Sequence, residues 1–399
     1  MFFAIAGILA EPNRIKTKTS GQAFNLDTNL HQYIVGISRA GKSKFLTEQA
    51  VDAALHGEKI VIFDNGASFK KCELEKHLPH DLVEKHFSFW NILKQGLPVN
   101  LCDLSNCDTL PEKKQRLKSI YAAGARALGT TQEKVLYKQI GVMLKEKGDD
   151  VDFLNILEYF IFESEKLTIL NNKFDSDQNK IILSPRNTYD EKIGEKGIVS
   201  ILDYLNENDN IEKALRDKFE GIFQDLKNLL KSTATWDEFL ENQKNIVVIS
   251  TGDDEHAKNT SLIDMLLASF YGFKQHNPIK RITVIIDECQ DLYLDTNGPL
   301  DIMLRKGGKH GIRMLIASQE FSSLKDKLGK IIGNCGTLVF FRPKNDNLTD
   351  IAKLTGVDKT VLANLEQGQC VVYGYLYNKS AGKNKQITLI GNTYEHEAQ

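Results

Sequence analysis

Long apolar runs and a strong charge of either sign are both missing from this chain. No stretch of its 399 residues reaches the roughly 18 apolar residues that a membrane-spanning helix requires, so we expect no integral membrane segment. The formal net charge is −2, although 26% of the residues are charged. A value so close to zero argues against a uniform electrostatic coat for nucleic acid, but it allows a local basic surface such as the lining of a pore.

Paired cysteines are also missing. The six cysteines form no C-x-x-C pair and no cluster with histidine at the spacing of a zinc site. Most of them lie in or beside apolar runs, which indicates reduced thiols in a cytoplasmic protein. The apolar start of the chain has no basic segment before it, and Gly7 interrupts it. A first strand is therefore expected there in preference to a signal peptide.

The clearest chemical signal is a short glycine-rich stretch. Residues 36–43 read G-I-S-R-A-G-K-S, a complete G-x-x-x-x-G-K-S phosphate-loop pattern. An apolar, β-branched run precedes it at 33–35, and apolar residues at helical spacing follow it as far as Leu55. Strand, glycine loop and helix together are the context in which backbone N–H groups and a helix N-terminus bind phosphate. The alternative is an ordinary turn between a strand and a helix.

This loop predicts a site for ATP and Mg²⁺. Gly36 and Gly41 allow the backbone to curl around the β-phosphate. Lys42 is expected to reach the β- and γ-phosphates, and Ser43 is expected to hold Mg²⁺. The nucleotide-binding residues predicted from the loop are Gly36, Ser38, Arg39, Ala40, Gly41, Lys42, Ser43 and Lys44.

Two later apolar runs end in polar residues that suit hydrolysis. One runs directly into Asp287 and Glu288, and the other ends in Ser-Gln at Gln319. We expect Asp287 to bind Mg²⁺ through water or to align Ser43, and Glu288 to polarise the attacking water as a general base. Gln319 can sense the γ-phosphate or orient water. The plainer alternatives are an acidic loop and a polar strand end. We expect the loop and the acids on adjacent strands.

Asp64 ends another predicted strand, at 59–63. The carboxyl end of a parallel strand is the edge of the sheet where ligands bind. A carboxylate at this position can face the nucleotide, face a neighbouring subunit, or cap the turn that follows it.

Strands and helices that alternate along the chain predict an α/β fold with a mostly parallel sheet flanked by helices. The pattern changes at 110–234, where amphipathic segments predict an inserted all-α domain with a polar loop at 171–197. The first pattern resumes after Trp236 and closes with an antiparallel pair at 369–374 and 386–389. The predicted domains are a short N-terminal strand segment (1–31), the core (32–109 and 235–399) and the helical insertion (110–234).

The order of these motifs resembles the HerA/FtsK superfamily of ring-forming, DNA-pumping ATPases, on its HerA and conjugative-ATPase branch. The resemblance covers residues 31 to about 390 and is carried by the segments 36–43, 60–69, 284–292, 305–319, 334–347 and 362–374. It implies a RecA-like P-loop NTPase core in a homo-hexamer that hydrolyses ATP at subunit interfaces and threads double-stranded DNA. In this family pattern Asp287 is the metal-side acid, Glu288 the catalytic acid and Gln319 the sensor.

Two departures from the family pattern affect what it implies. Family members supply an arginine to the neighbouring subunit's ATP from a position that is Gly308 here. An interface site needs such a cation to stabilise charge in the transition state. Arg305 is the first candidate for it, Arg313 the second and Arg342 a third. The N-terminal β-barrel of typical HerA proteins, where nuclease or effector partners dock, is missing or reduced to about 30 residues.

Three functions follow. The first is a double-stranded DNA translocase working with a nuclease or other effector, in DNA processing, plasmid transfer or phage defence. The second is a conjugative, type IV secretion-like ATPase that acts on protein at a membrane channel. The third is an ATP-gated oligomeric scaffold with little turnover. The feature that supports it is the missing arginine at Gly308. Candidate pore-lining cations, each also explained as solvated surface, are Lys70, Lys71, Lys325, Lys327 and Lys330.

Overall fold

The computed structural model describes residues 31–66, 68–126, 128–149, 214–215, 217–222, 226, 228–251, 260–277, 280–321, 333–378 and 383–392. Contacts divide the chain into two compact units, one formed by Leu101–Asn228 and the other by Met1–Asn100 with Leu229–Gln399. The predicted first strand within 1–31 and the predicted loop at 171–197 lie outside the described residues, as do Lys325, Lys327 and Lys330.

The described strands are β1 (Gln32–Val35), β2 (Lys59–Asp64), β3 (Phe87–Asn91), β4 (Ile246–Ser250), β5 (Ile282–Ile286), β6 (Ile312–Ser318), β7 (Thr337–Phe341), β8 (Gln369–Asn378) and β9 (Lys383–Asn392). The described helices are α1 (Lys42–Leu55), α2 (Lys71–Leu74), α3 (His80–His86), α4 (Ile92–Gln95), α5 (Leu110–Ala125), α6 (Thr130–Lys147), α9 (Trp236–Glu241), α10 (Thr260–His276), α11 (Pro299–Lys306), α13 (Leu348–Thr355) and α14 (Lys359–Ala363). Short 3₁₀ helices are η1 (Cys289–Asp291), η2 (Gly307–His310) and η3 (Asn345–Asn347). None of the helices in the described part of the chain combines the length and apolar character that crossing a bilayer requires.

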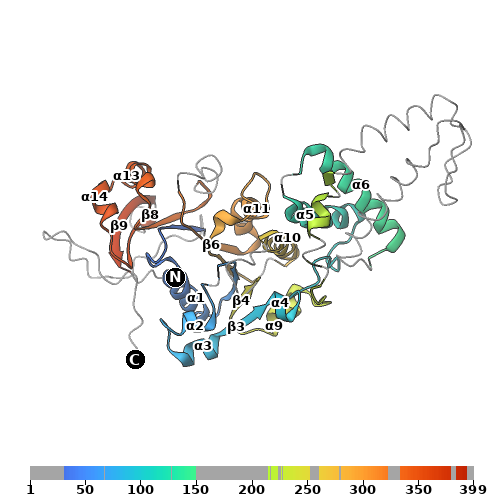
Figure 1. Ribbon diagram of the computed structural model, residues 1–399, viewed down its shortest axis with the longest axis horizontal. Helices are drawn as coiled ribbons and strands as arrows, with labels where there is room; N and C mark the ends of the chain where they lie inside the picture. Colours follow the sequence, from blue (N-terminus) through green and yellow to red (C-terminus); the bar gives the residue numbers. More distant parts are fainter. Residues whose placement is uncertain are drawn as a thin grey trace, which may run out of the picture. The chain divides into compact units, whose positions relative to one another are not determined.

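The described strands form one nine-stranded sheet in the order β3-β4-β2-β5-β6-β1-β7-β8-β9. Figure 1 shows β8 and β9 at one side of this sheet, away from β3 and β4. The strands from β3 to β7 in this order run parallel, and β8 and β9 complete the sheet as an antiparallel pair. The carboxyl ends of β2, β5, β6 and β1 therefore meet at one edge. This arrangement confirms the predicted mostly parallel sheet flanked by helices. It also shows that the expected adjacency of the loop strand and the acid strand was wrong, because β6 lies between β1 and β5.

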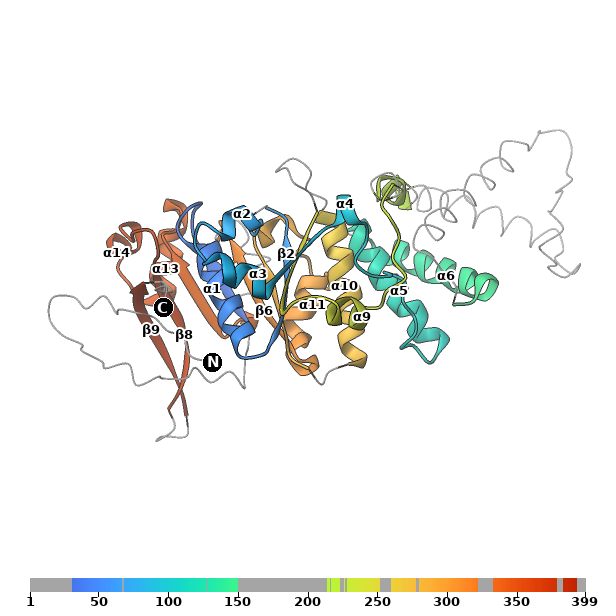
Figure 2. The same ribbon diagram turned by 90° about the horizontal axis from the view of Figure 1, so that it is seen from below.

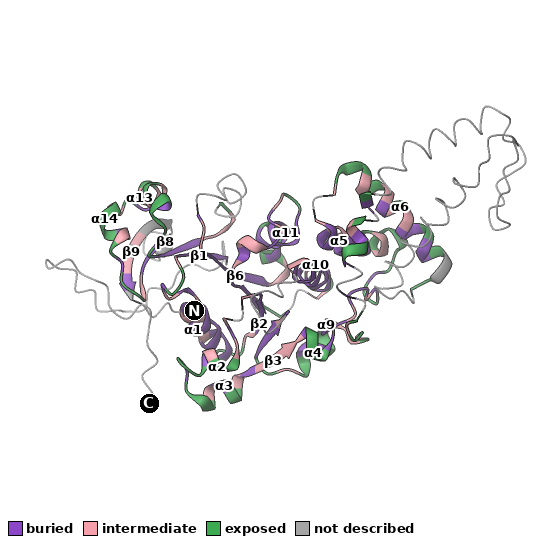
Figure 3. Cartoon of the chain, in the orientation of Figure 1, coloured by how far each residue is buried: buried purple, intermediate pink, exposed green. Residues whose placement is uncertain are grey.

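Continuous apolar runs explain why the central strands are covered on both faces. Every residue of β1, β5, β6 and β7 is buried, and Figure 3 shows exposure concentrated on the outer helices. Helix α1 packs on one face, where Phe45 and Leu46 join Leu315 in one apolar cluster. On the other face lies η2, because a side chain at Gly307 would meet Ile312 at 3.2 Å and alternate residues of β6 point to opposite faces.

Two features of the sheet were not predicted from the sequence. Strand β3 adds a parallel edge next to β4. Its sequence, FSFWN, sits in a polar region and is too short for its alternation to stand out. The closing strands β8 and β9 are ten residues long each and so exceed the predicted spans. Beyond Gly374, β8 pairs with β9 alone, and Figure 2 shows this part as a two-stranded ribbon.

The described part of the second unit is mostly helical from Leu110 onward. Helix α5 begins at a capping box, in which the Thr109 hydroxyl accepts from the Glu112 N–H and the Glu112 carboxylate accepts from the Thr109 N–H. Helices α5 and α6 pack together, and Lys118 pairs with Glu133 across them at 2.7 Å. These helices match the helical period that the sequence shows in the first part of the insertion.

Candidate functional site

Strand ends hold the glycine loop on one side. The Gly36 N–H donates to the carbonyl of Ser318 at 3.2 Å, and the Ile37 N–H donates to that of Arg342 at 2.9 Å. The loop therefore rests on the carboxyl ends of β6 and β7, the two neighbours of β1. A side chain at the first glycine is excluded, because its Cβ would lie 2.7 Å from the Cβ of Phe341.

The far end of the loop touches the segment just before β8. The Gly368 N–H donates to the carbonyl of Ala40 at 3.0 Å. Gly41 has a φ of 116°, and a Cβ there would lie 3.2 Å from the Cα and N of Gly368. Glycine is required at this position both by the positive φ and by the close approach of a second backbone.

The chemistry of a phosphate loop depends on its lysine and serine, which here open helix α1. Lys42 is buried, and its Nζ donates to the loop carbonyls of Gly36 at 2.9 Å and Ile37 at 3.3 Å. These bonds hold the ammonium group inside the curve of the loop. Because α1 begins here, its first N–H groups face the same space and favour a bound anion.

A hydrogen bond joins the loop to the acidic strand. The Oγ of Ser43 donates to Oδ2 of Asp287 at 2.8 Å. The carboxylate of Asp287 is buried, and its Oδ1 accepts the N–H of Glu288 at 3.0 Å. A hydroxyl and a carboxylate oxygen side by side are hard oxygen donors of the kind that Mg²⁺ prefers. Ser43 and Asp287 therefore fit the metal-binding role predicted for them.

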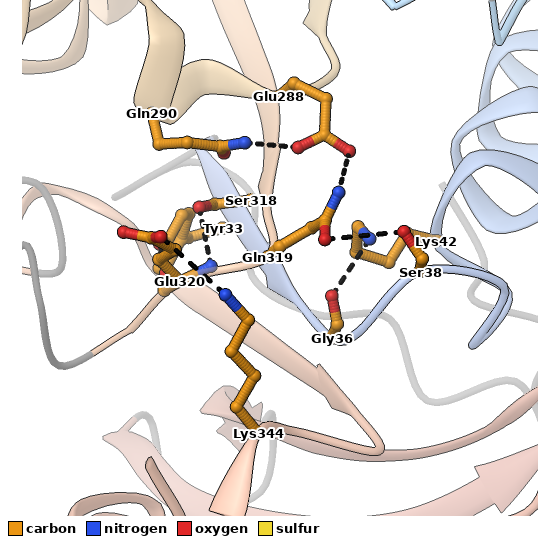
Figure 4. A network of polar contacts seen from close by, with 10 residues as sticks. All are labelled: Tyr33, Gly36, Ser38, Lys42, Glu288, Gln290, Ser318, Gln319, Glu320 and Lys344. Carbon is orange, nitrogen blue, oxygen red and sulfur yellow. Dashed lines mark hydrogen bonds and ion pairs between the residues drawn. The ribbon is translucent and has the colours of Figure 1, made fainter. Parts of the chain in front are cut away.

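Glu288 lies between two glutamines beside the loop (Figure 4). Its Oε1 accepts from Nε2 of Gln319 at 2.8 Å, and its Oε2 accepts from Nε2 of Gln290. The Oε1 of Gln319 accepts from Oγ of Ser38 at 3.4 Å. The intervening strand β6 explains this arrangement, since it places Gln319 between the loop and the acid. The predicted sensor and general base thus lie together at the edge of the sheet.

The carboxylate of Asp64 caps the turn that follows β2. It accepts the backbone N–H groups of Gly66, Ser68 and Phe69 at 3.0–3.2 Å, which supports the capping alternative. Burial raises the pKa of Asp64 to about 6, and the nearby Asp287 charge adds to the rise, while the three N–H donors oppose it. The described hydrogen bonds of Asp64 all go to the turn after β2, and none of them reaches the phosphate loop.

Residues on the other side of Gln319 fix the turn after β6. The hydroxyl of Tyr33 donates to the carbonyl of Glu320 at 2.7 Å, and Lys344 pairs with the carboxylate of Glu320 at 3.7 Å (Figure 4). These contacts tie the residue after Gln319 to strand β1 and to the end of β7.

The structure does not bring every predicted residue to this site. Arg305 lies on α11, where it pairs with Asp301 at 2.6 Å and donates to Asn297. Arg313 lies near the amino end of β6 and is 1% exposed, so it lies away from the carboxyl edge. No described hydrogen bond links Arg39 or Lys44 to the acids. Arg39 is exposed, and Lys44 is half-buried.

Two residues of the site were missed by sequence reasoning. Gln290 contacts Glu288, and its place two residues after the acid pair, in a tight turn, is the signal that points to it. Gly368 contacts the loop from a distant segment, and only its position just before a predicted strand marks it.

The sheet and the glycine loop define a RecA-like P-loop fold, as the sequence predicted. The chain has this fold in common with the plasmid coupling protein TrwB in complex with ADP and Mg²⁺, at a TM-score of 0.59 and 13% identity, covering 94% of this chain and 88% of that one. TrwB in complex with the ATP analogue ADPNP gives a TM-score of 0.60 and 14% identity, covering 92% and 86%. VirB4 of Thermoanaerobacter pseudethanolicus gives 0.55 and 14%, covering 93% and 91%.

A family model adds a match in sequence. Residues 281–385, about a quarter of the chain, match the model described as the TraM recognition site of TraD and TraG. The matched segment begins at the strand that carries the acids and extends into β9. No curated protein matches the chain significantly.

Proposed function

We propose that this chain is the ATP-hydrolysing subunit of a motor for conjugative DNA transfer. The observation that carries the proposal is the 2.8 Å hydrogen bond between Ser43 and Asp287, with Glu288 and Gln319 in contact beside it. The fold in common with a plasmid coupling protein and the match at 281–385 support conjugative transfer over a HerA-like function with a nuclease partner.

The positions of the residues support the following roles. Lys42 would exchange the loop carbonyls for the β- and γ-phosphates, and the N-terminus of α1 would add partial positive charge. Ser43 and Asp287 would hold Mg²⁺, which supplies charge neutralisation at the phosphates when bound. Glu288 takes the proton of the attacking water. Gln319 links the phosphate loop to this base, so the state of the γ-phosphate is communicated to Glu288.

The motor acts as a homo-hexameric ring on double-stranded DNA, in the cytoplasm beside a membrane channel that other proteins supply. A ring supplies the cation that stabilises transition-state charge from the neighbouring subunit. Arg305 remains the first candidate, because its guanidinium group is partly exposed on α11 and is held in place by Asp301. Burial at 1% exposure makes Arg313 the weaker candidate.

The test is ATP hydrolysis by the purified chain with and without duplex DNA. We expect duplex DNA to stimulate turnover and salt to weaken the stimulation, because phosphate contacts release counterions. Lys42→Ala should abolish turnover. Stimulation by a secreted protein in place of DNA would favour the protein-secretion alternative, and binding of ATP without turnover would favour the scaffold alternative.

Mixed rings test the contribution of the neighbouring subunit. Lys42→Ala subunits still offer Arg305, and Arg305→Ala subunits still offer an intact loop, so mixing two inactive variants should restore part of the activity. Arg342→Ala, which changes an exposed arginine at the same edge as the loop, tests the third candidate in parallel. Failure of the mixture, together with loss of activity in Arg342→Ala alone, would transfer the role to Arg342.

A further inference from the structure

Glu288 receives a second amide, and the proposed function gives this amide no role. Gln290 donates from Nε2 to Oε2 of Glu288, on the side opposite Gln319 (Figure 4). We propose that Gln290 is a positioning residue that holds the carboxylate of Glu288 in its working orientation during ATP hydrolysis. This inference rests on the proposed function, because it assigns a residue to the same hydrolytic site.

The chemistry of the two groups fixes how they meet. A carboxylate only accepts hydrogen bonds, whereas an amide has one donating and one accepting end. Gln290 must therefore present its nitrogen to Glu288. Its oxygen, Oε1, is then buried and has no hydrogen-bond partner among the described residues. The contact with Glu288 is thus the one polar interaction that fixes this side chain in the described structure.

The backbone conformation explains how Gln290, two residues after Glu288, can contact the carboxylate of Glu288. Glu288 has a φ of 55°, which is uncommon for a residue other than glycine and turns the chain sharply after β5. The turn is closed by a bond from the Asp291 N–H to the carbonyl of Glu288 at 3.1 Å, and Cys289 is fully buried within it. Gln290 is therefore presented on a short, well-anchored 3₁₀ turn.

The two glutamines are not equivalent. Gln319 also contacts Ser38 of the phosphate loop, so its position depends on what the loop holds. Gln290 has no such link, since it belongs to the same turn as the acid. When Gln319 turns toward a γ-phosphate, Gln290 continues to hold Oε2 of Glu288. Because Gln290 does not depend on the loop, it keeps the carboxylate of Glu288 in the same orientation while Gln319 moves.

Stability alone does not explain a glutamine here. A buried acceptor without a partner opposes folding, so an apolar side chain of the same length suits the position as well or better. A purely structural residue would lower the melting temperature when it is changed. A positioning residue would lower the rate of the chemical step and leave folding and nucleotide binding as they were.

The experiment compares Gln290→Met with the wild type as the full-length oligomer on duplex DNA. We expect kcat for ATP to fall roughly ten-fold, the loss typical of an outer residue that orients a reacting group. KM for ATP, the Kd of a fluorescent ATP analogue and the melting temperature should stay unchanged. Gln290→Glu, which keeps the shape but replaces the donor by an acceptor, should lose at least as much. Gln290→His, which retains an N–H donor, should recover part of the rate.

The matched control is Gln115→Met, an exposed glutamine on α5, which should behave as the wild type. Wild-type kcat in Gln290→Met would overturn the inference and leave the proposed function intact. A fall in kcat together with a raised KM and a lower melting temperature would also overturn it, in favour of a structural role. No turnover by the wild type would overturn the proposed function, and this inference with it.

Discussion

The two ends of strand β6 carry polar residues that the fold treats in opposite ways. At the carboxyl end, Gln319 bonds both to Glu288 and to Ser38. Near the amino end, Arg313 is buried, and its Nε, Nη1 and Nη2 atoms have no hydrogen-bond partner in the described structure. Burial lowers the pKa of Arg313 to about 10, although the charge of Glu58 partly opposes this. One strand thus links a paired polar site with an unpaired buried charge.

The comparison separates chemistry from stability. Glu288 and Gln319 at the carboxyl edge satisfy one another, so changes there should act on turnover more than on folding. A buried charge without a partner weakens a fold, so a change at the other end should act on stability and leave turnover unchanged.

Among the changes that test this comparison, the largest effect is expected for Glu288→Gln. This change keeps the size of the side chain but removes the proposed base, so kcat for ATP should fall roughly 10³-fold. Steady-state ATPase assays measure it, with binding of an ATP analogue expected to be retained. Glu320→Gln changes a second acid at the same edge and should keep most of the activity, since the described ion pair of Glu320 is with Lys344. Equal losses in both variants would contradict a special role for Glu288.

The next effect is a pH dependence at Asp64. Its pKa is raised to about 6 in the fold against 3.8 when unfolded, mainly by burial. The folded protein therefore binds this proton more tightly, and the carboxylate weakens the fold above pH 6. Relative to Asp64→Asn, the free energy of unfolding of the wild type should fall by about 3 kcal/mol between pH 3 and pH 7. Urea titrations at a series of pH values measure this difference.

The control for that pH dependence is Asp358→Asn. Asp358 is exposed, and its hydrogen bonds to Thr360 lower its pKa, so its contribution has the opposite sign. A pH-independent difference between the wild type and Asp64→Asn would show that this carboxyl group is not buried in solution as described.

A smaller gain is expected at the other end of β6. Arg313→Met removes the unpaired charge while keeping much of the volume, so the free energy of unfolding should rise by about 2 kcal/mol. Denaturant unfolding measures the gain, and ATPase assays should show unchanged kcat. Arg281→Met, at an exposed arginine nearby, should change stability by no more than about 0.5 kcal/mol. A loss of stability in Arg313→Met would mean that the guanidinium group has a partner after all.

The smallest effect concerns Gly308, just before β6. A Cβ there would meet nothing within 4 Å, so an arginine fits without strain. In an Arg305→Ala background, Gly308→Arg should restore kcat about ten-fold by returning a cation to the proposed subunit interface. Gly221→Arg, also in open space, is the control and should restore nothing. No recovery would place the neighbour's cation elsewhere, with Arg342 the next candidate.

The motifs whose place in the fold could be predicted from the sequence are contiguous in the chain. The glycine loop with Lys42 and Ser43, and the acid pair at the end of β5, each lie within a few residues, and an apolar run marks the strand before them. Local pattern is enough for such motifs. The geometry now links them through one hydrogen bond, from Ser43 to Asp287.

The parts that escaped prediction depend on distant partners or on backbone that the residue type does not reveal. The order of strands is one example: nothing local shows that β6 lies between β1 and β5. The contact of Gln290 with Glu288 is another example, because it depends on a left-handed φ at Glu288. A positive φ can be recognised in a sequence when the residue is a glycine, but not when it is a glutamate. Strand β3 was missed because its short alternation sits at an edge.

The bond between Ala40 and Gly368 also bears on how the protein is made. Strand β1 lies between β6 and β7, and the tip of its loop is closed by a residue that precedes β8. Both neighbours of β1 and this last contact leave the ribosome long after the loop itself. The phosphate loop therefore cannot reach its final conformation until most of the chain has been synthesised, because the segments that contact it are made last. A nascent chain released before Phe341 lacks a complete β7 and also lacks Gly368. Such an incomplete copy cannot form its phosphate loop and therefore cannot consume ATP.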